Sequence, residues 1–498
     1  MLTISRRTVL LGSAGGLLTV GGLAACNAST GTAVTSSSQA VEMAERARRV
    51  VGQRTVTARL VPRAATLDLG GPVVRSWVYG DGVPGPVLRA TADDRVVVIV
   101  DNALPESTSV HWHGVALRND MDGVPGMTQI PIGTNSQFTY DFTVPDPGTY
   151  FYHPHSGVQL DRGLYGVLVV DDPAEPGDYD AEWIVVLDDW VDGTGQTPDG
   201  VLGALRRGGA GASSMDHGSM AGMPMGGMGG DMQSPLLGGA GDVTYPHFLI
   251  NGRVPASPVT LSAKPGQRVR IRLVNAASDT AFRVALGGHR LTVTHSDGFP
   301  VVPTDTDALL IGMGERFDLV VTLGDGTFPL VASAEGKSGQ GMAIVRTAGG
   351  EVPDPDVTPA ELRKQVTLGT QLSAAPEVAL RAQEVDRTHD LVLGGSMTNY
   401  RWTINGKTFD EADPLEVRQG ERVRLRLRNM SMMFHPMHVH GHTFGLRKTE
   451  ARKDTVIVRP MESVEVDLDA VNPGQWATHC HNIYHAEAGM MTTLSYRA

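Results

Sequence analysis

The chain has 498 residues and a formal net charge of −12 at pH 7. This length accommodates about two to four domains, the hydrophobic fraction of 41% excludes wholesale disorder, and the acidic balance argues against a nucleic-acid partner. With 60 Gly, 30 Pro and only 5% aromatic residues, the composition favours short strands and turns over long helices. The two cysteines, Cys26 and Cys480, exclude a disulfide framework, whereas 16 His and 20 Met are unusual counts.

Residues 1–26 have the pattern of an export signal. Arg6-Arg7 precedes a short, Gly-rich apolar run that ends in Leu23-Ala24-Ala25-Cys26, which is typical of a cleaved signal rather than a membrane-spanning helix. The Arg pair is similar to twin-arginine signals. The end of the run resembles a bacterial lipobox with Cys26 as the lipidated residue; an ordinary cleavage site is the alternative. We expect an exported, periplasmic or otherwise extracytoplasmic protein, anchored to the cell membrane through Cys26 alone, with residues 27–49 as a tether.

The remainder of the chain contains three copies of one strand pattern. Each copy begins with Arg-Val and ends in Asn: Arg95–Asn102, Arg268–Asn275 and Arg422–Asn429. In the second and third copies apolar residues alternate with Arg, as in a half-buried strand. The copies are separated by the length of a β-sandwich domain. The sequence therefore predicts an all-β protein with three domains, at 50–173, 180–350 and 358–498, joined by stretches rich in Pro, Asp and Gly.

His-x-His pairs recur at matched positions of the first and third copies. One pair stands 16 and 18 residues after the opening Arg, and a second pair follows a Pro-Gly dipeptide by a fixed spacing. These pairs are His111/His113 and His153/His155 in the first copy, and His438/His440 and His479/His481 in the third, whereas the middle copy has Val284, Leu286, Val331 and Ser333 at the corresponding places.

The paired histidines predict a metal site between the first and third domains. Residues i and i+2 of a strand share a face, so each pair offers two imidazoles side by side. If these two domains pack together, all four pairs can converge. Neutral imidazoles suit copper, zinc or iron, and the affinity order favours copper.

The C-terminal run supplies a second kind of site. Cys480 lies inside the last His-x-His pair and points to the opposite face of its strand. Two histidines with a cysteine and a weakly bound axial methionine form the blue-copper electron-transfer arrangement. The candidate ligands are His435, Cys480, His485 and Met490.

Together the two sites suggest an oxidase mechanism. A blue copper takes single electrons from a substrate, and Cys480 connects it through the backbone to the eight-histidine site. Three coppers at that site together with the blue copper hold four redox equivalents, the number that reduces O₂ to two waters. We therefore expect four copper ions and O₂ as the electron acceptor.

These motifs resemble the four copper motifs of the multicopper oxidases, in particular the three-domain, laccase-like branch that includes bacterial copper-resistance oxidases. The motifs are His111-Trp-His113-Gly, Tyr152-His153-Pro-His155, His435-Pro-Met-His438-Val-His440-Gly and His479-Cys480-His481, and the resemblance covers about residues 50–498. It implies three consecutive cupredoxin-like Greek-key β-sandwiches. It also implies a type 1 copper at His435, Cys480, His485 and Met490, a type 2 copper at His111 and His438, and a type 3 pair at His113, His153, His155, His440, His479 and His481.

The resemblance also points to two acids that relay protons. Relatives carry an acid after the first motif, and Asp122 stands eleven residues after His111, where that acid is found; a simple turn residue is the alternative. Many bacterial relatives have Glu directly after the histidine of the fourth motif. Here Ala486 takes that place and Glu487 follows, so Glu487 is the second candidate, although a shift of one residue re-aims its side chain.

A methionine-rich insert at 213–234 suggests the substrate. Its thioethers are soft ligands that select Cu(I), and its Gly-rich setting lacks the apolar periodicity of a core; a low-complexity linker is the alternative. Similar segments mark the copper-resistance oxidases, although there the insert belongs to the third domain. Another candidate is Met433, from the cluster before His435, where Ser431 stands at the position that the resemblance assigns to Asp in Cu(I)-oxidising relatives. The candidate Cu(I) contacts in the insert are Met215, Met220, Met223, Met225, Met228 and Met232.

We therefore expect an exported oxidoreductase that converts Cu(I) to Cu(II) with O₂ and so detoxifies copper. Laccase-like oxidation of phenols and oxidation of Fe(II) are close alternatives, because electron entry from outside a blue-copper site tolerates many donors. A copper-storage or electron-transfer protein without turnover belongs to a different class, and the complete ligand set of the oxygen site argues against it. A two-domain copper nitrite reductase is also disfavoured, because it would lack both the middle copy without histidine pairs and the His-Cys-His sequence that joins the two copper sites.

Overall fold

The computed structural model describes residues 31–175, 177–208 and 233–498. The export-signal region with Cys26, and the insert methionines from Met215 to Met232, lie outside the described residues. Within the described ranges, no helix has the length and apolar character needed to cross a membrane.

The first repeat folds into two main sheets and a hairpin. One sheet has the order β1 (Thr55–Leu60), β5 (Arg95–Asp101), β7 (Gln137–Thr143), the other β4 (Leu88–Thr91), β9 (Gly166–Asp171), β8 (Gly148–His153), β6 (His111–His113), and β2 (Arg63–Asp68) pairs with β3 (Val73–Val78). Val98 and Val100 of β5 share one buried core with Trp112 and Tyr152 of the second sheet. The alternate apolar residues of the Arg-Val strand therefore face inward, as predicted.

The middle repeat has two six-stranded sheets. Their orders are β13 (His247–Ile250), β10 (Ala181–Trp190), β15 (Arg268–Asn275), β20 (Arg316–Thr322), β17 (Leu291–Ser296), β18 (Phe299–Thr306), and β14 (Thr260–Ser262), β22 (Gln340–Arg346), β21 (Thr327–Ala334), β16 (Phe282–Leu286), β19 (Ala308–Ile311), β23 (Val366–Leu368). A two-stranded ribbon of β11 (Gln233–Ser234) and β12 (Gly238–Gly239) follows helix α2 (Pro198–Gly208) in the described chain.

The third repeat again has two facing sheets. Their orders are β25 (Arg401–Ile404), β24 (Arg387–Ser396), β27 (Arg422–Asn429), β32 (Ser463–Asp469), β29 (Phe444–Leu446), β30 (Arg452–Lys453), and β26 (Leu415–Val417), β34 (Met491–Tyr496), β33 (Gln475–Cys480), β28 (His435–Val439), β31 (Thr455–Val458). The remaining helical elements are α1 (Gln39–Arg48), α3 (Ile483–Glu487), η1 (Asn119–Met121), η2 (Gln159–Arg162), η4 (Ala360–Arg363), η5 (Gly369–Gln371) and η6 (Phe409–Glu411).

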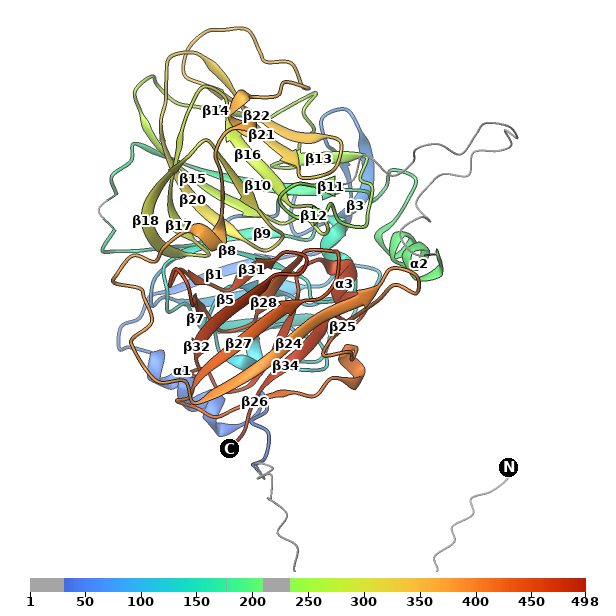
Figure 1. Cartoon of the computed structure of the whole chain (residues 1–498), viewed down its shortest axis with the longest axis vertical. Helices are drawn as coiled ribbons and strands as arrows, with labels where there is room; N and C mark the ends of the chain where they lie inside the picture. Colours follow the sequence, from blue (N-terminus) through green and yellow to red (C-terminus); the bar gives the residue numbers. More distant parts are fainter. Residues whose placement is uncertain (1–30, 176, 209–232) are drawn as a thin grey trace, which may run out of the picture. The chain divides into compact units, whose positions relative to one another are not determined.

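The three Arg-Val strands occupy equivalent places in their sheets. Strands β5, β15 and β27 each pair in parallel with a strand before them, β1, β10 and β24, and antiparallel with a later strand, β7, β20 and β32 (Figure 1). The internal repeat read from the sequence is thus a repeat of sheet topology, and the all-β prediction is confirmed.

The strand register shows which residues of the middle repeat replace the histidines. His111 lies opposite His153, His438 opposite His479, and Val284 opposite Ala332. The sequence offset predicts Val331 and Ser333 at this last place, which is wrong by one residue. Because side chains alternate across a strand, Ala332 shares the face of Val284, and Val331 belongs to a different core cluster. The middle repeat therefore fills the equivalent positions with apolar packing.

Two predicted boundaries differ from the structure. The predicted tether contains helix α1, which buries Val41 and Glu45; Glu45 Oε1 accepts hydrogen bonds from Thr143 N (3.1 Å) and Oγ1 (2.9 Å). Residues from Ala33 onward consequently belong to the folded unit. Strand β23, placed by sequence in the third domain, pairs with β19 of the middle repeat, because its apolar Leu368 is buried there.

Candidate metal centre

Three side chains converge at the C-terminal end of the third repeat. His435 begins β28, Cys480 ends β33 and His485 lies in α3. Cys480 Sγ is 3.6 Å from the Nδ1 atom of each histidine, and these two nitrogens are 3.1 Å apart. Met490 is fully buried, its carbonyl accepts from Cys480 N (3.1 Å), and its own N–H donates to the His485 carbonyl (3.0 Å). The structure thus brings the predicted thiol, the two imidazoles and the methionine into one buried place.

Local structure positions His485 in this group. Asn482 caps α3, because its side-chain oxygen accepts from the backbone N–H groups of Tyr484 (3.0 Å) and His485 (3.2 Å). The Asn482 amide in turn donates to Asp279 Oδ1 of the middle repeat (2.6 Å). The short helix that presents His485 is therefore tied to a second repeat.

The outer nitrogens of the two imidazoles have polar partners that sequence analysis missed. Nε2 of His485 is 2.9 Å from Asp242 Oδ2, and Nε2 of His435 is 2.8 Å from Ser431 Oγ. Burial lowers the pKa of His435. Burial is also the largest influence on His485, but Asp242 and Cys480 together oppose it and raise the pKa of His485 to about 10. Such partners orient a ligating imidazole and increase its basicity. The ring of Trp402 covers His485 at 4.2 Å between centroids.

The eight histidines of the four His-x-His pairs form a second group. Ligand atoms of His111, His438 and His440 lie within 4.8 Å of one another, as do those of His111, His113 and His153, and those of His155, His440 and His479. The His481 ring lies 4.8 Å from that of His113 and 5.3 Å from that of His153. The side chains come from β6, β8, β28 and β33 and the residues that follow them. The predicted convergence of the first and third repeats is what the structure shows.

Unpaired nitrogen atoms of these histidines indicate that the cluster holds metal. The buried atoms without a hydrogen-bond partner include Nε2 of His111, His153 and His438, Nδ1 of His113, and both ring nitrogens of His481. A buried polar group left unpaired costs about 1–3 kcal/mol, so several at one place point to ligands that bind something. Burial lowers the pKa of His113, His153, His155, His438, His440, His479 and His481, which keeps them neutral, the form that binds metal ions.

Two aspartates hold the cluster in a crosswise pattern. The carbonyl of Asp122 accepts from His111 Nδ1 (2.9 Å), and its Oδ2 is 3.0 Å from His440 Nδ1. The carbonyl of Asp454 accepts from His438 Nδ1 (2.9 Å), and its Oδ1 is 3.1 Å from His113 Nε2. Each aspartate therefore fixes one histidine of its own repeat through its backbone and one of the other repeat through its side chain.

The middle repeat supports one of these aspartates. Arg316 forms a two-pronged ion pair with Asp454, at 2.8 and 2.7 Å, and both side chains are fully buried. Burial would raise the pKa of Asp454, but the Arg316 guanidinium and the neighbouring imidazoles lower it well below its usual range. Gly314 of the same repeat approaches the cluster so closely that a Cβ would lie 2.8 Å from the His481 ring and 3.0 Å from that of His113.

The two groups of ligands share one short segment. Cys480 Sγ points to His435 and His485, while its chain neighbours His479 and His481 belong to the eight-histidine cluster. Successive residues of a strand point to opposite faces. The covalent link expected from His479-Cys480-His481 is therefore present.

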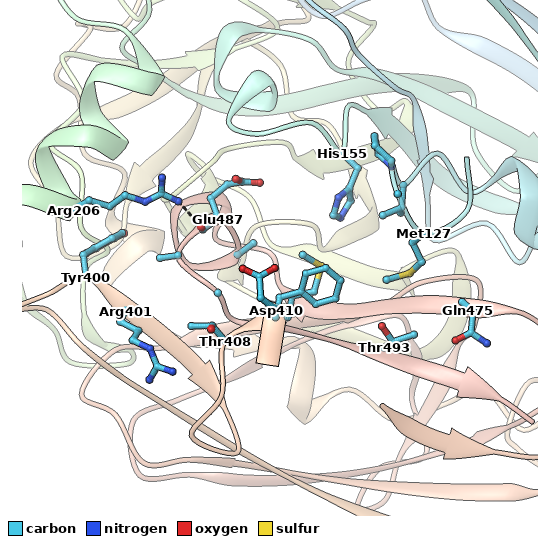
Figure 2. Close-up of a pocket in the computed structure, with 18 of the residues that line it drawn as sticks. Met127, His155, Arg206, Tyr400, Arg401, Thr408, Asp410, Gln475, Glu487 and Thr493 are labelled. Atoms are coloured by element: carbon cyan, nitrogen blue, oxygen red, sulfur yellow. Dashed lines mark hydrogen bonds between the residues drawn. The ribbon is translucent and has the colours of Figure 1, made fainter. Parts of the chain in front are cut away.

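A pocket of about 850 Å³ reaches the cluster from the surface. Its lining includes His155, the half-buried member of the eight, together with Glu487, Arg206 and Gln475. Figure 2 shows Glu487 between Arg206 and His155, and Arg206 Nη2 donates to the Glu487 carbonyl (2.6 Å). The structure thus places Asp122 against the cluster and Glu487 at the pocket that leads to it.

The remaining sequence candidates are methionines, and sequence analysis missed three charged residues that support the two sites. Met433 is half-buried and packs against Gly239 of β12, while the six insert methionines lie outside the described residues. Asp242, Arg316 and Asp454 were missed because no repeat offset marks them. Asp454 follows His438 by 16 residues, whereas Asp122 follows His111 by eleven.

Comparison with known proteins matches this arrangement to one family. Three stretches, residues 63–175, 230–350 and 384–498, match domain families described as multicopper oxidase. The multicopper oxidase MmcO of Mycobacterium tuberculosis is 51% identical, over 95% of this chain and 94% of its own. A copper resistance protein A homologue of Pseudomonas syringae pv. tomato is 30% identical, over 85% of this chain and 89% of its own.

Solved structures agree with the fold. Fet3p, described as a multicopper oxidase that functions in iron import, superposes with a TM-score of 0.74 at 20% identity, covering 89% of this chain and 90% of its own. These findings confirm the cupredoxin-like fold class, the oxidoreductase activity and the four coppers of types 1, 2 and 3 that we expect from the sequence. The chain belongs to the multicopper oxidase family, whose members use O₂ and a reducing substrate.

Proposed function

We propose that this protein is a cuprous oxidase, which oxidises Cu(I) to Cu(II) and passes the electrons to O₂. The observation that carries the proposal is where the two ends of the methionine-rich segment are held. Helix α2, before the segment, contacts α3 through the hydrogen bond from Arg206 to the Glu487 carbonyl. Strand β12, after it, packs against Met433, and Asp242 follows at His485. Both ends therefore lie beside the cysteine-containing site, where electrons enter.

The polar groups around this site suit a small cation as electron donor. Asp242 Oδ1 is buried without a hydrogen-bond partner while Oδ2 contacts His485. Met433, two residues before His435 and against Gly239, adds a soft thioether. The thioether is a soft ligand that selects Cu(I), and the negative charge of the carboxylate favours a cation over a neutral phenol. The similarity to copper resistance protein A, as that relative is named, supports the same substrate.

The proposal assigns ligands to the four coppers as the family motifs imply. Type 1 copper takes His435, Cys480, His485 and Met490; type 2 takes His111 and His438; the type 3 pair takes His113, His153, His155, His440, His479 and His481. When bound, these ions supply one-electron oxidation at the first site and four-electron reduction of O₂ at the others.

Protons for the water that forms come from the two candidate acids. Asp122 is fully buried, its Oδ2 contacts His440 Nδ1 (3.0 Å) and its Oδ1 lies 3.2 Å from His111 Nδ1, so its carboxylate is placed to pass protons to the cluster. Glu487 lines the surface pocket with His155 (Figure 2), so it can deliver protons from solvent. As part of the same proposal, residues 1–26 export the protein to the periplasmic side and Cys26 anchors it to the membrane.

Oxygen uptake by the copper-loaded protein tests the substrate. We expect rapid uptake with Cu(I), and a fall of at least tenfold when residues 213–232 are removed. A variant of full length with Ser at the six insert methionines is the matched control for segment length, and its uptake should fall as far as that of the deletion variant. Faster turnover of phenols or Fe(II), unaffected by either change, would overturn the proposal in favour of a broad laccase or a ferroxidase.

A further inference from the structure

Solvent-exposed methionines gather in two adjacent loops beside the type 1 candidate site. Among the described residues, Met43, Met430, Met432 and Met461 are 59%, 46%, 73% and 63% exposed. Met43 lies on α1, whereas the other three lie where β27 leads to His435 and in the turn between β31 and β32. We propose that Met430, Met432 and Met461, here called the outer methionine site, bind substrate Cu(I) at the surface before it reaches Met433. This inference rests on the proposed function.

Hydrogen bonds hold the two loops together. The last residues of the β27/β32 ladder are Arg428 opposite Ser463, and Asn429 N then donates to the Glu462 carbonyl (2.9 Å). The next residues of the two segments are Met430, whose N–H donates to the Leu393 carbonyl (2.9 Å), and Met461 in the turn. The Asn429 side chain also donates to the Met433 carbonyl (2.6 Å). The three exposed thioethers therefore project from backbone segments that are fastened to each other.

Met461 occupies a position where local stability favours another residue. Its φ is +59°, in the left-handed region that glycine and asparagine adopt most easily. Its side chain is largely exposed, so burial does not compensate for this conformation. A long apolar residue with neither a backbone preference nor a packing role fits a chemical role, for which the thioether is the candidate group.

The outer methionine site is continuous with the type 1 candidate ligands. Gly238 of β12 packs on Pro460, and Gly239 packs on Met433. Ser431, between Met430 and Met432, contacts His435 Nε2 at 2.8 Å. Residues 430–434 thus connect the exposed thioethers directly to His435. Strand β12 covers Met433, the methionine of this segment nearest in sequence to His435.

The chemistry of this surface selects a soft monovalent cation. Thioethers are neutral, soft ligands that prefer Cu(I) to Cu(II) or zinc. The nearest charges given by the turn, Arg459 and Glu462, neutralise each other in an ion pair of 2.9 Å. The three thioethers add no charge of their own, and as soft ligands they bind Cu(I) and release Cu(II) after oxidation.

Methionine footprinting with Ag(I) tests the site without turnover, because Ag(I) has the same soft character and is not oxidised. The copper-loaded full chain is treated with hydrogen peroxide with and without Ag(I), and oxidation of each methionine is measured by mass spectrometry. We expect Ag(I) to slow oxidation of Met432 and Met461 at least tenfold, with Met43 unchanged in the same sample. Equal oxidation rates at Met432 and Met461 with and without Ag(I) would overturn the proposal.

Paired variants give a second measurement. The double variant M432L/M461L keeps side-chain volume and removes sulfur, and it should bind one Ag(I) fewer per chain by equilibrium dialysis. The control M43L should bind as many as the unsubstituted protein; an equal loss in both would contradict the proposal. The footprint is independent of oxygen uptake, so protection without Cu(I)-driven uptake would refute the proposed function and leave the outer methionine site standing.

Discussion

The two halves of the histidine cluster are built alike but supported differently. Asp122 in the first repeat and Asp454 in the third make the same crosswise pair of contacts, one through the carbonyl and one through the carboxylate. Only Asp454 has a counter-ion, Arg316, which the middle repeat provides. A repeat with no histidine in the cluster thus contributes through charge, and it does so to one half only.

This difference suggests a division of labour. Asp454 has both oxygens in the ion pair with Arg316 and a pKa well below the usual range, so it stays ionised and holds His113 and Arg316 in place. Asp122 has no cation of this kind beside it: its Oδ1 lies 3.2 Å from His111 Nδ1 and its Oδ2 3.0 Å from His440 Nδ1. We therefore propose that one half of the cluster is a fixed scaffold and that the other carries the proton group of the proposed function.

The largest effect should come from removing the counter-ion. Arg316→Met leaves Asp454 buried without its partner, and such a loss costs about 3–5 kcal/mol. We expect the free energy of unfolding of the metal-free protein to fall by this amount in urea denaturation. Arg426→Met is a control at a half-exposed ion pair and should change it by less than about 1 kcal/mol. Equal, small changes in both variants would show that the two halves need no different support.

A smaller but more selective effect should separate the two aspartates. Asp122→Asn keeps the side-chain shape but removes the proton acceptor, so the rate of oxygen uptake should fall about 10–100-fold while copper content stays near four ions. Asp454→Asn removes the charge that pairs with Arg316, so His113 and His438 are no longer held in place. The copper content itself should therefore fall. Metal analysis beside oxygen uptake distinguishes the two. Matched losses of copper in both variants would remove the distinction between scaffold and proton group.

The sequence predicted which eight histidines the structure brings together, because their positions repeat. The offsets from Arg95 and Arg422 place His111 and His438 in equivalent strands. Because side chains alternate along a strand, the second histidine of each pair points to the same face as the first. The sheet repeat and the fold class follow from the same periodicity. Where the offset failed, at Val331, a shift of one residue in the return strand moved the prediction to the other face.

The supporting residues were beyond sequence reasoning for a different reason. Asp242 and Arg316 come from the middle repeat and act across repeat boundaries, where no spacing rule applies. Sequence analysis likewise missed that residues 33–49 are part of the folded unit. Helix α1 is stabilised by contacts with residues far along the chain, such as the hydrogen bond that Glu45 accepts from Thr143. Periodicity predicts which residues share a face of one sheet, and it contains no information on how separate sheets meet.

The residues that follow the two aspartates differ, and the smallest effect should come from Thr455, which follows Asp454. Asp122 precedes Gly123, where φ is +81° and a Cβ would lie 1.9 Å from the Val110 carbonyl oxygen, so no side chain fits. Asp454 precedes Thr455, whose hydroxyl donates to Asp454 Oδ1 at 2.8 Å.

Thr455→Val removes this hydroxyl with little change in shape and should lower the free energy of unfolding by about 1 kcal/mol. Because Arg316 still holds Asp454, copper content should not change, and denaturation of the metal-free protein is the readout. Thr443→Val, at a less buried hydroxyl, is the control. A loss of copper in Thr455→Val would mean that the hydroxyl itself positions the cluster, through its 3.1 Å contacts with His113 Nε2 and His438 Nδ1, and that Arg316 is not sufficient support.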